Sequence, residues 1–399
     1  MLLRTPRDWL GYANQVCFNH TKMAATFFLR WLTKKEQNRG EETMVAYVKP
    51  RWRRDGKRKP NEGRGRHAYT FAAIDLGTNN CRLLVARPSG DGFRVIDAFS
   101  RIVRLGEGMS ETGALTEDAM ARTVDALRVC AAKMRRRRVD RARLVATDAC
   151  RRAINSEAFL KRVEAETGLF LEVIPTEEEA RLALRGCSPL FTSDKRRALV
   201  FDIGGGSTEV MVLDTDLQCA AGSGGPAESG CWISLPFGVV SLSERYGGDV
   251  ISRENYTAMI EDVDRRLAPF CARNDIAGSA RNGELQMLGA SGTVTTLMGV
   301  YLDLLRYDRA QVDGTYIGFS SIRQISDRLR GMCCAERATH PCIGSDRADL
   351  VVAGCAILEA MCRRWPVGRL RVADRGLREG ILMDLMVASD QGTSGLAQA

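Results

Sequence analysis

A short internal repeat constrains the fold of this chain more than any other sequence feature. Residues 74–80 read Ile-Asp-Leu-Gly-Thr-Asn-Asn, and residues 201–207, 127 positions later, read Phe-Asp-Ile-Gly-Gly-Gly-Ser. In each copy an apolar strand ends near an aspartate, and a glycine turn and a second apolar run follow. A period this long is not that of a solenoid. We therefore expect two duplicated α/β lobes that face each other and bind a ligand between them at the strand ends.

Composition excludes several classes of protein. The 399 residues are 45% apolar and 27% charged, which is typical of a globular protein, and three histidines do not suggest a histidine-rich metal site. No P-loop motif occurs. No window reaches the roughly 18 uncharged apolar residues of a membrane span. The 13 cysteines contain no Cys-x-x-Cys pair, so we expect buried thiols and a cytoplasmic protein.

The positive charge is confined to the start of the chain. Residues 1–67 carry a net charge of +10, whereas the whole chain carries +9, so the remainder is nearly neutral. We expect 1–67 to be a solvated, disordered extension, with contact to nucleic acid as the alternative. A start of synthesis at Met44 is a further alternative. The predicted domains are lobe I at 68–182, lobe II at 183–390 and a flexible tail at 391–399.

The two glycine loops are candidate phosphate-binding sites. Successive glycines permit positive φ and bring backbone N–H groups up to an anion, while nearby hydroxyls and amides add donors. The candidates are Asp75, Gly77, Thr78, Asn79 and Asn80 in the first loop, and Gly204, Gly205, Gly206, Ser207 and Thr208 in the second. Asp202 and Glu209 flank the second loop, which makes sense if Mg²⁺ lies between these carboxylates and phosphate oxygens. The alternative is a tight glycine hairpin with capping acids.

Three other segments carry weaker signals. Gly292 follows Ser291 at a predicted helix start, where an anion would be favoured, with close packing of strand and helix as the alternative. The spacing of Thr176 and Glu179 is that of a capping box, so the first interpretation of Glu179 is a helix cap. Arg151 alone is interpreted as a surface residue. The apolar pattern predicts a strand at Leu169–Ile174 and helices at 177–185 and 376–388.

Several ordered motifs identify the chain as similar to a known family. They include AIDLGTNNCRLLVA, TDACRRAIN, PTEEEARLALRG, VFDIGGGSTEV, LGASGTVTTL and GLREGIL. They resemble the Ppx/GppA phosphatase family of exopolyphosphatases and guanosine pentaphosphate phosphohydrolases over residues 71 to about 388, in its short form. The resemblance implies the actin / sugar kinase / Hsp70 fold, with two ribonuclease-H-like lobes and a cleft between them.

The resemblance also implies roles for individual residues. Glu179 matches the catalytic carboxylate that activates a water, and Arg151 matches an arginine that grips phosphate. The two loops match the family's phosphate loops, with Asp202 and Glu209 as partners of Mg²⁺. Family members are often homodimers, and by analogy we expect this chain to form a homodimer.

The expected activity is release of terminal phosphate from inorganic polyphosphate, because that substrate needs only repeated phosphate contacts. Hydrolysis of pppGpp at the same site is the main alternative. A kinase of the same fold and a non-catalytic sensor of nucleotides or alarmones are further alternatives. The presence of Glu179, Arg151, Asp202 and Glu209 argues against a sensor.

Overall fold

The computed structural model describes residues 69–90, 92–215 and 230–394. The chain divides into the units Met1–Tyr47 and Val48–Ala399, and everything described below belongs to the second unit. The predicted extension at 1–67 and residues 395–399 of the predicted tail therefore lie outside the described residues.

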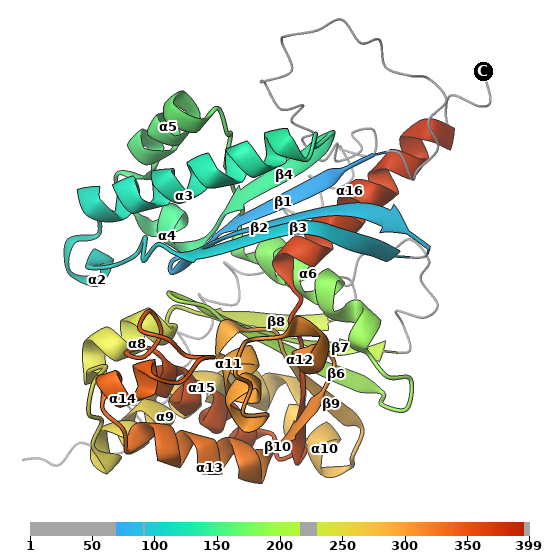
Figure 1. Cartoon of the computed structure of the whole chain (residues 1–399). Helices are drawn as coiled ribbons and strands as arrows, with labels where there is room; N and C mark the ends of the chain where they lie inside the picture. Colours follow the sequence, from blue (N-terminus) through green and yellow to red (C-terminus); the bar gives the residue numbers. More distant parts are fainter. Residues whose placement is uncertain (1–68, 91, 216–229, 395–399) are drawn as a thin grey trace, which may run out of the picture. The chain divides into compact units, whose positions relative to one another are not determined.

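A five-stranded sheet forms the centre of the first lobe (Figure 1). Its order is β3-β2-β1-β4-β5, with bounds β1 Phe71–Leu76, β2 Asn80–Ser89, β3 Gly92–Ile102, β4 Arg141–Ala146 and β5 Glu172–Val173. The central strand β1 pairs antiparallel with β2 and parallel with β4. Because β1 is buried and apolar, it forms the core of the lobe and carries Asp75 to its carboxyl end.

Four helices belong to the first lobe: α2 Met109–Thr112, α3 Glu117–Arg136, α4 Asp148–Arg152 and α5 Ser156–Thr167. Thr116 caps α3, since its hydroxyl accepts a hydrogen bond from the N–H of Ala119 at 3.3 Å. At the other end of α3, Lys133, Arg136 and Arg137 form ion pairs with Asp97 of β3. The arginine run of this helix therefore fastens α3 to the sheet.

The second sheet repeats the arrangement of the first. Its order is β10-β11-β9-β6-β7-β8, with bounds β6 Arg197–Ile203, β7 Thr208–Asp214, β8 Gly230–Leu235, β9 Leu285–Gly289, β10 Tyr316–Gly318 and β11 Arg369–Val372. The strand β6 pairs antiparallel with β7 and parallel with β9, as β1 does with β2 and β4. Asp75 lies opposite Arg82, and Asp202 lies opposite Glu209. The duplication predicted from the sequence is thus present in strand order and in register.

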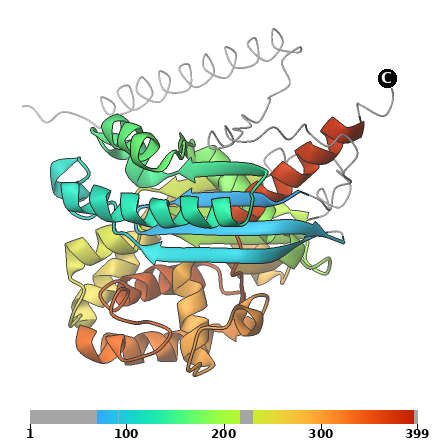
Figure 2. The ribbon, with the colours of Figure 1, turned by 45° about the horizontal axis from the view of Figure 1, so that its top comes forward.

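Helices cover the second sheet and enclose the largest apolar core of the described residues. They are η2 Ser188–Leu190, α8 Val239–Tyr246, α9 Arg253–Asn274, α10 Ile276–Arg281, α11 Gly292–Tyr301, α12 Arg309–Val312, α13 Phe319–Arg330, α14 Cys334–Ala338 and α15 Val351–Arg364. Figure 1 shows most of these helices on the side of the second sheet that faces away from the first lobe, and in Figure 2 they lie below the strands of the first sheet.

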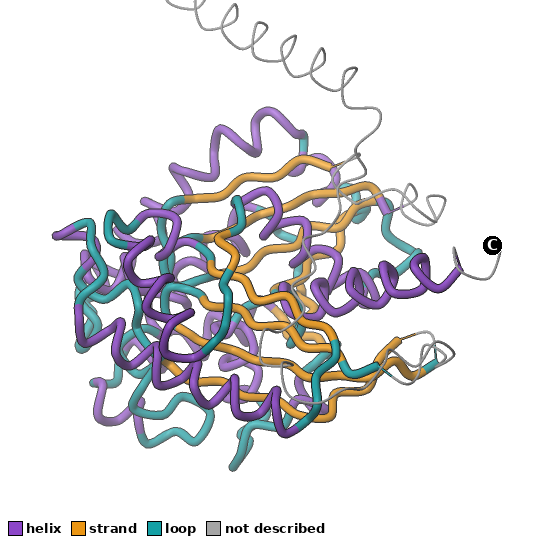
Figure 3. Tube along the Cα trace, turned by 90° about the horizontal axis from the view of Figure 1, so that it is seen from above, coloured by secondary structure: helices purple, strands orange, loops and turns teal. Residues whose placement is uncertain are grey.

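Two helices, α6 Thr176–Cys187 and α16 Leu377–Ser394, pack against each other beside the first sheet. Figure 3 shows α16 running alongside strands towards the C-terminus. Ile381 and Leu385 of α16 share an apolar cluster with Phe71 and Leu84 of the first sheet. Residues 377–390, which the sequence assigned to lobe II, therefore pack on lobe I, because the apolar side of α16 covers a face of that sheet. The helix also continues to Ser394, inside the predicted tail.

The described cysteines are all free thiols and most of them are buried, as expected. Among the helices that the structure describes, none is both long enough and apolar enough to cross a membrane.

Candidate active site

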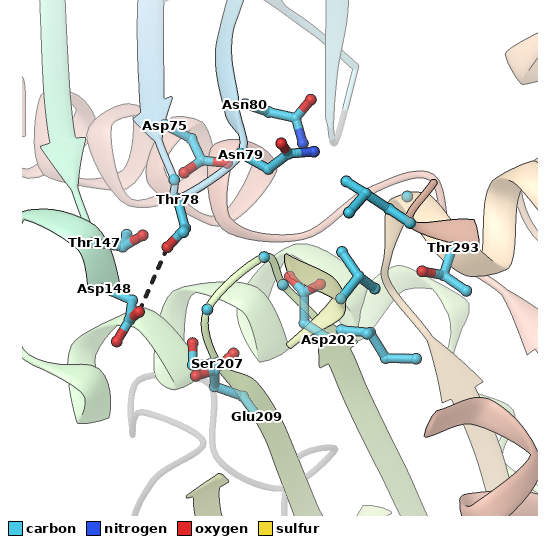
Figure 4. Close-up of a pocket in the computed structure, with 18 of the residues that line it drawn as sticks. Asp75, Thr78, Asn79, Asn80, Thr147, Asp148, Asp202, Ser207, Glu209 and Thr293 are labelled. Atoms are coloured by element: carbon cyan, nitrogen blue, oxygen red, sulfur yellow. Dashed lines mark hydrogen bonds between the residues drawn. The ribbon is translucent and has the colours of Figure 1, made fainter. Parts of the chain in front are cut away.

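The carboxyl ends of β1 and β6 bring the two glycine loops face to face across a cavity of about 110 Å³ (Figure 4). In Figure 4 the side chains of the first loop lie above those of the second. The predicted residues that line the cavity are Asp75, Gly77, Thr78, Asn79, Asn80, Glu179, Asp202, Gly204, Gly205, Gly206, Ser207, Glu209 and Gly292. Parts of the sequence more than 100 residues apart thus meet at one small site.

The glycines of the second loop are needed for close approach. A Cβ atom at Gly205 would lie 3.1 Å from the Cβ atoms of Thr78 and Asn79, and one at Gly206 would lie 2.2 Å from Oδ2 of Asp148. Neither these glycines nor Gly204 adopts a positive φ. The expectation that they supply positive φ is therefore wrong. Glycine is needed at 205 and 206 because the close contact between the loops leaves no room for a side chain.

Thr208 does not line the cavity. Its side chain is fully buried, and its hydroxyl donates to the carbonyl of Phe237 at 2.9 Å. Thr208 therefore joins β7 to the turn after β8. The prediction that it belongs to the phosphate-binding surface is not supported by its position.

Glu179 lies in the first turn of α6 with its carboxylate on the cavity wall. The N-cap of α6 is Pro175, and no side chain caps the helix, so the capping interpretation of the Thr176–Glu179 spacing does not hold. The pKa of the Glu179 carboxyl is raised to about 8: burial raises it most and nearby Glu209 adds to the rise, whereas Arg151 opposes it. A carboxylate in such surroundings is a stronger base than one in water.

Arg151 reaches the site only through Glu179. One of its terminal nitrogens donates to Oε2 of Glu179 at 2.7 Å and to the carbonyl of Ile174 at 3.0 Å. Arg151 is not among the residues that line the cavity. The family resemblance implies that Arg151 grips phosphate, whereas in this structure its guanidinium binds the carboxylate of Glu179.

Two further acids face the same space from the second lobe. Burial raises the pKa of Asp202 to about 7, with Arg82 opposing the shift and Asp75 adding to it. Burial also raises the pKa of Glu209 to about 7, although a hydrogen bond from Ser207 opposes it. Glu209 also accepts a hydrogen bond from the hydroxyl of Ser234 at 2.9 Å. Positive charge arriving at the cavity would therefore stabilise both in the ionised form.

These carboxylates fit a magnesium ion that is held largely by its substrate. The described residues contain no ready-made cluster of three or more metal-binding side chains. Magnesium usually keeps several waters and binds one or two carboxylates together with substrate phosphates. Asp202 and Glu209, opposite each other on β6 and β7, are the residues that would supply such a pair of oxygen ligands.

Sequence reasoning missed three charged residues of the cavity wall: Arg82, Asp148 and Arg347. Asp148 lies 3.5 Å from the hydroxyl of Thr78. The repeat contained a signal for Arg82, because this residue corresponds to Glu209 in the second copy. Arg82 and Arg347 also line a wider adjoining cavity of about 680 Å³, so they lie where the narrow site opens out.

Comparisons with known proteins identify a family that this chain resembles. The model of the Ppx/GppA phosphatase family matches residues 84–389. The chain is 30% identical over 331 residues to Exopolyphosphatase 2 of Mycobacterium tuberculosis, covering 79% of this chain and 98% of that protein. It is also 30% identical over 318 residues to a Guanosine-5'-triphosphate,3'-diphosphate pyrophosphatase of Photobacterium profundum. That match covers 79% of this chain but only 59% of the relative.

Solved structures show the same fold. The Ppx/GppA family member of Aquifex aeolicus matches with a TM-score of 0.64 and 29% identity, covering 80% of this chain and 98% of that one. The predicted fold class, two actin-like lobes with a cleft between them, is confirmed. The relatives are hydrolases by name, and the family model covers most of this chain. The chain belongs to the Ppx/GppA phosphatase family.

Proposed function

We propose that this protein is a Mg²⁺-dependent hydrolase that removes terminal phosphate from inorganic polyphosphate. The observation that carries the proposal is the position of Glu179, whose carboxylate lines a cavity bounded by two facing glycine loops. Phosphate loops without a base would suit a sensor, and a base without them would leave a polyanion unbound. The combination supports hydrolysis.

Glu179 is the proposed general base. A water between its carboxylate and the terminal phosphorus attacks that phosphorus and transfers a proton to Glu179. The new P–O bond forms as the bond to the bridging oxygen breaks, releasing orthophosphate and a chain one phosphate shorter. The raised pKa of Glu179 makes its ionised carboxylate a strong acceptor for this proton, and phosphate release should rise as the group ionises around pH 8.

The loops bind and orient the substrate. Backbone N–H groups of the glycine loops and the hydroxyls of Thr78 and Ser207 are donors for phosphate oxygens. Bound at Asp202 and Glu209, magnesium would neutralise phosphate charge beside these carboxylates. Arg82 and Arg347 add positive charge where the cavity widens.

The narrow part of the site favours polyphosphate over a larger substrate. Its volume of about 110 Å³ suits a phosphoryl group. The alternative substrate, pppGpp, is supported by the name of the Photobacterium relative and by the adjoining cavity of about 680 Å³, which has room for a nucleoside.

The test is phosphate release by the full-length protein from long-chain polyphosphate, tripolyphosphate, pppGpp and ATP, each with Mg²⁺ and with EDTA. We expect Mg²⁺-dependent release, fastest from polyphosphate. Faster release from pppGpp would select the alternative substrate. A correctly folded protein that releases phosphate from none of them would contradict the hydrolase proposal.

A further inference from the structure

The loop that follows β3 is bonded to the first phosphate loop. The N–H groups of Val103 and Arg104 donate to the carbonyl of Asn79 at 2.8 and 3.1 Å. The N–H of Gly106 donates to the carbonyl of Thr78 at 2.9 Å. Residues 103–106 therefore move together with one wall of the cavity.

The side chain of Arg104 crosses from this loop to the second lobe. Its two terminal nitrogens donate to the two carboxylate oxygens of Asp349 at 2.8 and 2.9 Å, and one also donates to the carbonyl of Asp346 at 3.1 Å. Forked pairing of this kind fixes orientation as well as distance. Between these two residues lies Arg347, which lines the cavity and donates to the hydroxyl of Thr296 at 3.1 Å. Arg104 thus holds the chain on both sides of Arg347.

The backbone of Arg104 supplies a second, independent observation. Its φ of 47° lies in the left-handed region, which is uncommon for any residue other than glycine. Glycine would adopt this conformation without steric cost. A non-glycine residue held there marks a position where the side chain is worth testing for function.

A smaller contact joins the same parts of the two lobes. Glu244 of α8 accepts hydrogen bonds from the hydroxyl of Ser110 at 2.7 Å and from the N–H of Gly108 at 3.4 Å. The chain itself connects the lobes through α6 and through residues 373–376 before α16. Figure 1 shows α2 and α8 at the left and α16 at the right. The polar contacts therefore join the lobes away from the covalent connections.

We propose that the Arg104–Asp349 ion pair is a clasp between the lobes. Arg104 and Asp349 are positioning residues that set the separation between the first phosphate loop and Arg347. Both side chains are about one-third exposed, so water competes for the pair and the clasp is reversible. Substrate enters or leaves when the pair breaks, and the catalytic geometry is complete when it forms. The kinetic part of this proposal rests on the proposed function.

The kinetic test is a double-mutant cycle with Arg104→Ala, Asp349→Ala and the combined variant, assayed on long-chain polyphosphate with Mg²⁺. Exposed ion pairs are worth up to about 1 kcal/mol, so each single change should raise KM by roughly three- to fivefold. The combined variant should be no worse than either single variant. Exchanging the charges, with Arg104→Asp and Asp349→Arg together, should restore part of the loss. The proposal would be overturned if the KM increases of the two single variants multiply in the combined variant and the charge exchange restores nothing.

A matched control changes a residue of the same loop and leaves the clasp intact. Glu107 lies in the same loop and pairs with Arg122 of the first lobe at 2.6 Å, so Glu107→Gln should leave KM unchanged. An equal rise in KM would show a general effect of disturbing the loop and would overturn the proposal.

Hydrogen exchange of the unliganded protein tests the clasp without any activity. Arg104→Ala should speed amide exchange in residues 346–351, on the opposite lobe, as well as in 103–106. Faster exchange confined to 103–106 would overturn the proposal. Because this readout needs no substrate, it separates failure of the clasp from failure of the proposed hydrolase activity.

Discussion

At the scale of single residues, the site is built from carboxyl groups that resist ionisation. Asp202 and Glu179 lie where burial raises their pKa values to about 7 and about 8. Folding is made less favourable by placing such groups together, because they ionise freely in the unfolded chain. A cation bound at these carboxyl groups would offset this cost.

Arg151 should affect the pH dependence of the reaction through Glu179. Because Arg151 lowers the pKa of Glu179, its removal in Arg151→Ala should raise that pKa above about 8. The base then ionises only at higher pH, so phosphate release should rise at higher pH than in the wild type. Arg151→Lys, which keeps the charge, should fall in between. An unchanged pH profile with a raised KM would instead support the predicted role in gripping phosphate.

Asp202→Asn should stabilise the metal-free protein at alkaline pH. The pKa of Asp202 rises from 3.8 to about 7 on folding, so the wild type loses stability between these values as pH rises. Asparagine cannot ionise and escapes this loss. We expect a gain of about 2 kcal/mol at pH 8 and little change at pH 4, measured by urea unfolding in EDTA. The figure allows for partial exposure of the side chain to the cavity. Equal stability of the two proteins at pH 8 would contradict this account.

At the scale of helices and strands, the sequence predicted the repeated strands well, but it did not predict every strand that pairs with them. The strand β3 was not predicted, because it is largely exposed and shows no clear alternation of buried and exposed residues. The strand predicted at Leu169–Ile174 shortens to Glu172–Val173, since only these residues pair with β4. The helix predicted at 177–185 forms as Thr176–Cys187, with little change in bounds.

The packing of α6 on α16 could not be predicted from local sequence, because it depends on two helices almost 200 residues apart. It is possible only where side chains are absent: a Cβ at Gly380 would lie 2.0 Å from the carbonyl oxygen of Leu182. A Cβ at Gly186 would lie equally close to the carbonyl oxygen of Gly376. These glycines therefore let the helix that carries Glu179 pack closely on the last helix.

Gly380→Ala should destabilise the protein by about 2 kcal/mol, because the helices must separate to admit a methyl group. Gly92→Ala is the matched control, since a Cβ there meets no atom within 4 Å. Thermal unfolding should show a lower midpoint for Gly380→Ala alone. If both variants unfold together with the wild type, the helix contact is looser than described here.

At the scale of the whole molecule, the repeat predicted two lobes and placed Asp75 and Asp202 at their interface. It could not show that the last helix returns to the first lobe, because that depends on which apolar surfaces remain uncovered. Nor did spacing assign Glu179 to the site, since the same pattern is a capping box. Its position on the cavity wall follows only once α6 is placed beside both sheets.

The most direct test of the account compares Glu179→Gln with Glu177→Gln in phosphate release from polyphosphate with Mg²⁺. Both acids lie in the first turn of α6, but Glu177 is exposed and does not line the cavity. We predict that Glu179→Gln lowers kcat by about 10²- to 10⁴-fold, the usual contribution of a general base, while Glu177→Gln remains near wild type. Equal activity of the two folded variants would contradict the assignment of Glu179 as the base.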